Sequence, residues 1–273
     1  HEERLCKPLA ARAAEIGPLV LRLGLAVMLL LAATGGLPRH GTAMWTEPTL
    51  LVPDMQLGIV PGWDWLIAVQ LGIAILLMLG LFTRAASIGL IALALFGPVL
   101  FGATFLSYTP HFAAPGLMLA LAGGGALSLD REFAIADPLV PARVLLQPGW
   151  RLAQILVGAG FLYLAIAYKL TQPTLLIAIL DHGSLPTFGI PNAVVALIMT
   201  GIEIICGALL IVGRLTRPVA LAIIGAITVL AIGLGETPLF HANLYGVMIF
   251  FALSGQALSE GRATAARYER IDA

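Results

Sequence analysis

The sequence predicts an all-α integral membrane protein with eight transmembrane helices, arranged as two fused, parallel four-helix bundle repeats. Three observations predict this fold: an apolar composition, eight uncharged stretches of membrane-spanning length, and motifs that recur at a nearly fixed spacing. Hydrophobic residues make up 59% of the 273 residues and charged residues only 11%, whereas about a quarter of the residues in a soluble domain are charged. A composition of this kind is typical of a chain that is solvated by lipid.

Eight stretches, each of roughly 18 to 22 residues, are nearly free of charge and long enough to cross a hydrocarbon core of about 30 Å. Backbone polar groups in lipid must be paired within the protein, and the stretches lack the alternation of barrel strands, so we expect helices. The stretches are 17–37, 64–82, 85–106, 112–129, 151–171, 192–212, 217–235 and 240–258. They divide the chain into an N-terminal segment 1–16, a first repeat 17–129, a linker 130–150, a second repeat 151–258 and a tail 259–273.

Basic residues predict how the helices are oriented. Nearly all of them fall on one side of the predicted spans, and only Arg39 and Lys169 stand out on the other. The positive-inside rule therefore places both termini in the cytoplasm and the chain in the inner membrane, with the longer connections 38–63 and 172–191 outside. The residues on the cytoplasmic side are Arg4, Lys7, Arg12, Arg84, Arg131, Arg143, Arg151, Arg214, Arg217, Arg262, Arg267 and Arg270.

Two groups of residues recur between the halves and predict the internal repeat. The first group keeps one constant spacing and consists of Gly80, Thr83 and Arg84, matched by Gly213, Thr216 and Arg217. The second group keeps a slightly shorter constant spacing and consists of His111, Gly116, Met118 and Gly125, matched by His241, Gly246, Met248 and Gly255. Because each half has an even number of spans, the repeats would be related by an axis along the membrane normal.

The second half also carries a series of residues that forms a family pattern: Gly158, Tyr168, Lys169, Leu170, Glu203, Gly207, Gly213, Thr216, Arg217 and Pro218. In these residues it resembles the DoxX type of four-helix unit. That unit opens with a helix that carries arginine, glycine and a terminal lysine. Its second helix carries a glutamate ahead of a Gly-Leu-Leu-Thr-Arg-like turn. The whole chain is therefore similar to a tandem pair of DoxX-like units.

Both halves depart from the family pattern at particular positions. The first half keeps Arg22, Gly24 and the turn 80–84, but it has Gly36 near the place of the lysine and Gln70 in place of the glutamate. In the second half, Arg151 lies about one turn earlier than the family arginine would. The missing acid in the first half favours the second half as the seat of function.

The DoxX-like family is associated with the membrane subunit of thiosulfate:quinone oxidoreductase and with other redox-linked or stress-linked membrane assemblies. The resemblance implies an inner-membrane subunit associated with redox chemistry, with quinone as its cofactor. If the chain is an enzyme, the resemblance implies a quinone-linked oxidoreductase subunit. Its implied partners are the bilayer and other membrane or periplasmic redox subunits. Fold likeness alone does not establish a reaction, so the individual residues have to carry that argument.

Glu203 is the candidate catalytic residue that the sequence marks most clearly. It lies 14 residues before Arg217, about 21 Å from the cytoplasmic end at 1.5 Å per residue, which predicts a place in the outer half of the bilayer. A carboxyl group in a membrane span costs roughly 2.5 kcal/mol or more and usually has a partner, for which Lys169 is the natural candidate. The pair is either a proton relay or quinone head-group site, or a structural interhelical contact.

Three further polar residues are candidate quinone-binding residues beside this pair. Tyr163 and Tyr168 lie on the same predicted helix as Lys169 and are alternative hydrogen-bond partners for Glu203. Gln70 occupies the position equivalent to Glu203 in the first repeat. An amide there carries no charge, which predicts a more structural role for the first half.

Histidines on the predicted outer side support an alternative function. His111 and His241 occupy equivalent repeat positions, and a pseudo-twofold axis would bring them together. With a neighbouring carboxylate they are candidate ligands for a transition metal or a haem iron, which predicts a transporter or a metal- or haem-handling protein. The other residues of this candidate set are His40, His182, Asp54, Asp181 and Glu236. Solvated loop histidines are the competing interpretation, and a structural or assembly subunit is the third functional class.

Several other functions are not supported by any motif. The sequence has neither the phosphate-binding GxxxxGK[ST] loop nor a GxGxxG turn between a strand and a helix, so we expect no nucleotide. Its 15 basic and 15 acidic residues balance, so no net field predicts a nucleic-acid partner. Cys6 and Cys206 have no partner at redox or metal-binding spacing.

Overall fold

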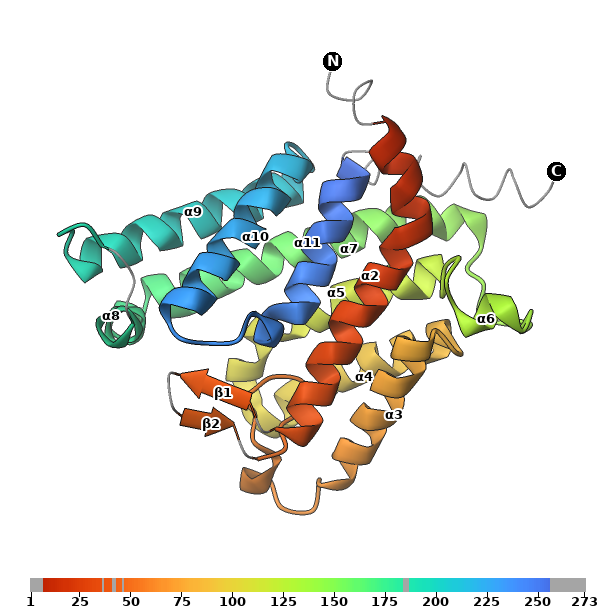
Figure 1. The fold of residues 1–273 in the computed structure, drawn as a ribbon, viewed down its shortest axis with the longest axis horizontal. Helices are drawn as coiled ribbons and strands as arrows, with labels where there is room; N and C mark the ends of the chain where they lie inside the picture. The colour runs from red at the N-terminus through yellow and green to blue at the C-terminus, as the bar shows by residue number, and fades with distance from the viewer. Residues whose placement is uncertain (1–6, 36, 41–42, 46, 184–186, 256–273) are drawn as a thin grey trace.

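The computed structural model describes residues 7–35, 37–40, 43–45, 47–183 and 187–255. Within these residues the fold is helical, apart from one small antiparallel hairpin formed by β1 (Leu37–His40) and β2 (Ala43–Trp45) (Figure 1). The predicted helical fold class is confirmed at this level. The N-terminal residues 1–6 and the predicted tail 259–273 lie outside the described residues.

The helices follow one another along the chain with short turns. Those of the first half are α2 (Lys7–Thr34), η1 (Leu57–Ile59), α3 (Trp65–Leu79), α4 (Thr83–Phe101), η2 (Gly102–Ser107) and α5 (Thr109–Ala122). A short helix α6 (Leu129–Glu132) lies in the connection between the halves. Those of the second half are α7 (Arg143–Leu164), η3 (Ala165–Leu170), α8 (Pro173–His182), α9 (Asn192–Val212), α10 (Thr216–Gly233), η4 (Pro238–His241) and α11 (Ala242–Ser254).

Five of the described helices are long and apolar enough to cross a membrane. They are Arg12–Thr34, Thr83–Ser107, Arg143–Leu170, Asn192–Val212 and Thr216–Gly233. The other three predicted spans fall on shorter apolar helices, namely α3, α5 and the segment Pro238–Ser254. The chain is therefore a multi-pass helical protein whose exposed apolar surface indicates a lipid environment.

Three predicted connections contain more regular structure than the sequence indicated. The connection 38–63 holds the β-hairpin and η1, and the connection 172–191 holds α8. The predicted linker 130–150 is shorter, because α7 begins at Arg143. Its first turns are amphipathic: Leu146 and Trp150 are buried, whereas Val144 is 78% exposed. An amphipathic stretch of this kind escapes a search for uniformly apolar segments.

The bundle has two distinct ends. The arginine end, defined by Arg84, Arg151 and Arg217, includes the start of α2 and the end of α11, toward the upper right of Figure 1. The loop end, defined by the connections 38–63 and 172–191, lies toward the lower left with β1, β2 and α8. These two names are used for the ends of the bundle below.

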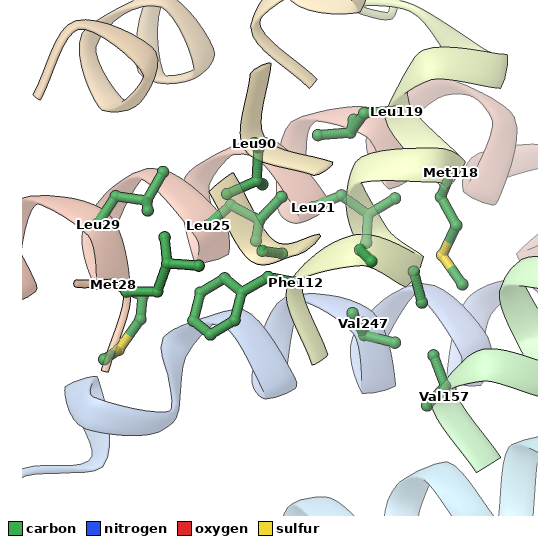
Figure 2. Packing of buried hydrophobic residues seen from close by; sticks show 14 of the residues in the cluster. Leu21, Leu25, Met28, Leu29, Leu90, Phe112, Met118, Leu119, Val157 and Val247 are labelled. Atoms are coloured by element: carbon green, nitrogen blue, oxygen red, sulfur yellow. The ribbon is translucent and has the colours of Figure 1, made fainter. Parts of the chain in front are cut away.

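The two halves meet through their first and last helices. Helix α2 lies along α11, and helix α5 lies along α7, so each half contributes both members of an equivalent pair. The apolar core between them contains side chains from α2, α4, α5, α7 and α11, among them Leu25, Leu90, Phe112, Val157 and Val247 (Figure 2). One continuous core therefore joins the two halves.

The turns that the sequence matched between the halves have the same conformation. Gly80 and Gly213 end α3 and α9 in the left-handed region, with φ values of 67° and 80°. Glycine reaches this region without the steric cost of a side chain, so it commonly ends helices. Thr83 and Thr216, which begin the next helices, are both buried with 1% exposure.

The arginines of these turns also make equivalent contacts. The Nε of Arg84 donates to the carbonyl of Ala120 at 2.9 Å, and the Nε of Arg217 donates to the carbonyl of Ala252 at 3.1 Å. Each arginine thereby satisfies the free carbonyl groups at the end of α5 or α11. These two acceptors are slightly further apart in the sequence than the matched histidines are. The contacts therefore align α5 with α11 in a register that differs a little from the one read from the histidines and glycines.

Two glycines bring α7 and α9 into close backbone contact. A Cβ atom on Gly158 would lie 2.6 Å from the carbonyl oxygen of Gly207, and one on Gly207 would lie 2.8 Å from that of Gly158. Real Cβ atoms do not approach so closely, so these positions set the distance between the helices. Small residues at such contacts are typical of membrane helices.

We expect Gly207→Ala to lower the free energy of unfolding by roughly 1–3 kcal/mol, because the added methyl group forces α7 and α9 apart. The measurement is thermal unfolding of the purified protein in detergent. Gly201→Ala, on the same helix, is the matched control, since its Cβ meets nothing within 4 Å. Equal effects of the two changes would contradict the glycine contact.

Candidate functional site

Lys169 lies in a π-helical segment at the loop end of α7. Helix α7 continues directly into η3, in which the backbone adopts π-helical geometry, and the amide of Thr171 donates to the carbonyl of Ile166, five residues back, at 3.3 Å. The segment ends at Thr171 because Gln172 precedes Pro173, and a residue before proline is disfavoured in the α region. Single π-helical turns within α-helices are frequent at functional sites.

The predicted partner of Lys169 is present. The Nζ of Lys169 donates to Oε2 of Glu203 on α9 at 2.6 Å. The side chains retain 23% and 13% of their exposure, so the pair is largely removed from its surroundings. The close contact between Gly158 and Gly207 brings α7 and α9 together below this pair, and the extra residue of the π-helical turn changes the direction in which Lys169 projects.

The depth predicted for Glu203 was too close to the loop end. Helix α9 ends at Val212, and the turn at Gly213 separates it from Arg217, so a count to Arg217 includes residues outside the helix. Glu203 is the twelfth of the 21 residues of α9. At 1.5 Å per residue it lies about 16 Å from the start of the helix, close to its middle.

The two candidate tyrosines flank the lysine. The rings of Tyr163 and Tyr168 meet edge to face, with centroids 6.1 Å apart. The hydroxyl of Tyr168 donates to the carbonyl of Ala103 in η2, at 3.3 Å. Tyr168 thus connects the π-helical segment to the first half, and both rings form an aromatic wall next to Lys169.

Gln70 lies in the first half and ties three segments together. Its Oε1 accepts from the amide of Leu51 at 2.9 Å, and its Nε2 donates to the carbonyls of Leu29 and Thr49 at 3.1 and 3.2 Å. The residue has no exposed surface. Gln70 therefore holds the connection 47–57 against α2 and α3, whereas its sequence counterpart Glu203 forms the ion pair.

The two repeat-matched histidines have different surroundings. His111 is 6% exposed, its ring meets Phe161 edge to face at 5.3 Å, and its Nδ1 is buried without a hydrogen-bond partner among the described residues. His241 lies at the end of η4, where its Nε2 is 3.6 Å from a carboxylate oxygen of Glu236. The carbonyl of His111 accepts from Asn243 of α11 at 3.4 Å, so α5 and α11 do meet at the loop end.

No group of three or more histidine, cysteine, aspartate or glutamate side chains converges as a metal site within the described part of the chain. The side chains of His40 and His182 lie outside that description. A metal or haem site therefore stays a prediction, and the side chains that the structure does describe form no complete ligand set for it.

Sequence reasoning missed a polar group at the arginine end. Arg22 has 1% exposure and donates to the carbonyl of Leu77 at 3.0 Å, while Gln154 is fully buried on α7. Their signal in the sequence was a polar side chain within an apolar stretch, the same signal that marked Glu203. We assigned a role only to the acid, although burial is equally costly for any unpaired polar group.

The fold and these contacts define a class: a multi-pass helical protein with helices of membrane-spanning character and an ion pair between two of them. No family model matches the chain. No curated protein and no solved structure matches it either. Further assignment therefore rests on the geometry of the chain itself.

We expect Lys169→Met and Glu203→Gln to be coupled in a double-mutant cycle by about 1–3 kcal/mol, a value between those of exposed and fully buried pairs. Each single change leaves the other group without its partner, so the double variant should lose less stability than the two losses added. The measurement is unfolding in detergent. As a control, Tyr245→Phe removes a 2.7 Å contact with Thr228 and should add to Glu203→Gln within about 0.5 kcal/mol. Additive losses for Lys169 and Glu203 would show that the pair has no energetic coupling.

Proposed function

We propose that this protein is a membrane subunit of a redox system and that it binds a quinone head group at Lys169 and Glu203. The observation that carries the proposal is the 2.6 Å ion pair on a π-helical segment. Ionisable residues within membrane spans are costly and commonly mark ion, proton or substrate sites. The DoxX-like pattern, which includes both residues, supports the same interpretation.

The chemistry of the pair suits a quinone. A quinone carbonyl accepts a hydrogen bond, which an ammonium group donates well, and full reduction of a quinone consumes two protons for two electrons. Lys169 would hold the head group and Glu203 would store or pass a proton. Tyr163 and Tyr168 supply aromatic surface beside the pair, as a planar ring requires. The electrons would come from a partner redox subunit.

The proposed architecture is eight membrane spans in two parallel repeats, with both termini in the cytoplasm. The equivalent turns at Gly80 and Gly213 and the equivalent contacts of Arg84 and Arg217 support the repeat. The arginines near one end support the orientation, because positive charge favours the cytoplasmic side. The asymmetry between Gln70 and Glu203 supports placing the quinone site in the second half alone.

We expect Glu203→Gln to weaken binding of a short-chain ubiquinone or menaquinone about tenfold or more, since bonds involving charged groups contribute about 1.5–3 kcal/mol. Binding is measured by titration of the purified protein, together with the quinone content of its lipid extract. Tyr245→Phe should bind as the unaltered protein does. A correctly folded Glu203→Gln variant with unchanged quinone binding would exclude this site.

We expect single cysteines at opposite ends of the bundle to differ in their access to a membrane-impermeant maleimide. In a background without Cys6 and Cys206, cysteine at Ile59 or Phe188 should react in intact cells. Cysteine at Phe82 or Phe133 should react only after permeabilisation. All four native side chains are more than half exposed. Labelling of Phe82→Cys in intact cells would contradict the assignment of α3 as a span.

A further inference from the structure

Comparison of the two halves at the arginine end reveals an anion position that is filled in one half. In the first half, Asp130 places its carboxylate at the N-terminus of α4. Its Oδ1 accepts from the amide of Phe82 at 2.6 Å, and its Oδ2 accepts from the amide of Thr83 at 3.0 Å. The first amides of a helix lack intrahelical partners and carry partial positive charge, so a carboxylate is stabilised there.

A buried arginine accompanies this carboxylate. Arg22 uses both terminal nitrogens: Nη1 donates to the carbonyls of Leu77 and Met78 at 3.0 and 3.3 Å, and Nη2 donates to that of Leu127 at 2.5 Å. Asp130 also interacts electrostatically with Arg22. The first half thus combines a helix N-terminus, an arginine and a neutralising anion.

The second half has the same helix N-terminus and an equivalent arginine. Leu215 and Thr216 begin α10 as Phe82 and Thr83 begin α4, and both Leu215 and Phe82 are left-handed, with φ values of 53° and 47°. Arg151 donates through Nη2 to the carbonyl of Ile211, which precedes Gly213 as Met78 precedes Gly80. The two arginines therefore reach corresponding carbonyl groups on α9 and α3.

The anion of the first half has no counterpart among the described residues of the second half. The Nη1 of Arg151 is buried without a hydrogen-bond partner there, and so is the Nε1 of Trp150, a residue that is 3% exposed. Two buried donors and the first amides of α10 are thus left together without an acceptor. A buried donor that lacks an acceptor costs about 1–3 kcal/mol, which favours a ligand that supplies one.

A fully buried side chain faces the same helix start. The Nε2 of Gln154 lies 3.5 Å from the hydroxyl oxygen of Thr216, and its Oε1 has no partner among the described residues. The oxygen and nitrogen of an amide can exchange places by rotation, so Gln154 can present a donor to a bound anion while it accepts from Thr216. The exposed Arg214 in the adjoining turn adds positive charge.

We propose that the arginine end of the second half binds the oxyanion of a phosphate group between Arg151, Gln154 and the amides of Leu215 and Thr216. Helix N-termini with arginine are typical phosphate sites, and basic pockets between membrane helices bind anionic lipid head groups. The phosphate would come from an anionic lipid or from a soluble phosphate compound. The proposal does not depend on quinone binding, which lies at the other end of α7.

The test uses the full chain, purified in phosphate-free detergent, and two probes: inorganic phosphate, and nanodiscs that contain phosphatidylglycerol or only phosphatidylcholine. Either inorganic phosphate or phosphatidylglycerol should raise the thermal unfolding temperature. Stabilisation by inorganic phosphate assigns a soluble ligand, and stabilisation by phosphatidylglycerol alone assigns a lipid. If neither probe stabilises the protein relative to sulfate-free buffer or phosphatidylcholine, the proposal is wrong.

Gln154→Glu is the decisive variant, because it places a permanent carboxylate at the start of α10, as Asp130 does in the first half. It should raise the unfolding temperature without phosphate and remove the response to the probe. Gln154→Leu, which adds no charge, should retain the response, and Arg151→Gln should weaken binding roughly tenfold, as expected for one charge-assisted hydrogen bond. An undiminished response of Gln154→Glu would overturn the proposed site even if Arg151→Gln failed to fold.

Discussion

The structure depends on pairing the carbonyl groups that are left free where helices end at the arginine end of the bundle. The last carbonyl groups of every helix lack intrahelical partners, and lipid supplies no donors for them. Arginine side chains from neighbouring helices supply those donors: Arg84 and Arg217 bind the ends of α5 and α11, and Arg22 and Arg151 bind the ends of α3 and α9. Each arginine joins two helices of one half, so these contacts organise both halves in the same way.

Polar side chains are used differently at other points of the bundle. At the same place in the repeat, Gln70 binds only backbone groups and holds a connection in place, whereas Glu203 binds Lys169. The first arrangement leaves no charge, and the second keeps two opposite charges within the helical layer. This difference separates a half whose polar residues serve the fold from a half that retains ionisable groups suited to chemistry.

Much of the helical layout could be predicted from the sequence, and part of the candidate site as well. Uncharged stretches identified the helices, and Gly80 and Gly213 marked two of their ends. The pairing of Lys169 with Glu203 followed from the cost of an unpaired charge in a span. Helix α8, the early start of α7 and the depth of Glu203 were not predicted correctly, because amphipathic turns and helix ends depend on which side chains the neighbouring helices bury.

The sequence by itself determined that the chain is a helical membrane protein, where its helices lie, and which acid needs a partner, because hydropathy and charge are local properties. Only the tertiary structure decided that η3 is π-helical, that Gln70 holds a connection, and that His111 faces α7. It also placed a carboxylate on α4 but left the start of α10 without one among the described residues. These outcomes depend on how closely the helices approach and which groups then face each other, and no single segment encodes that distance.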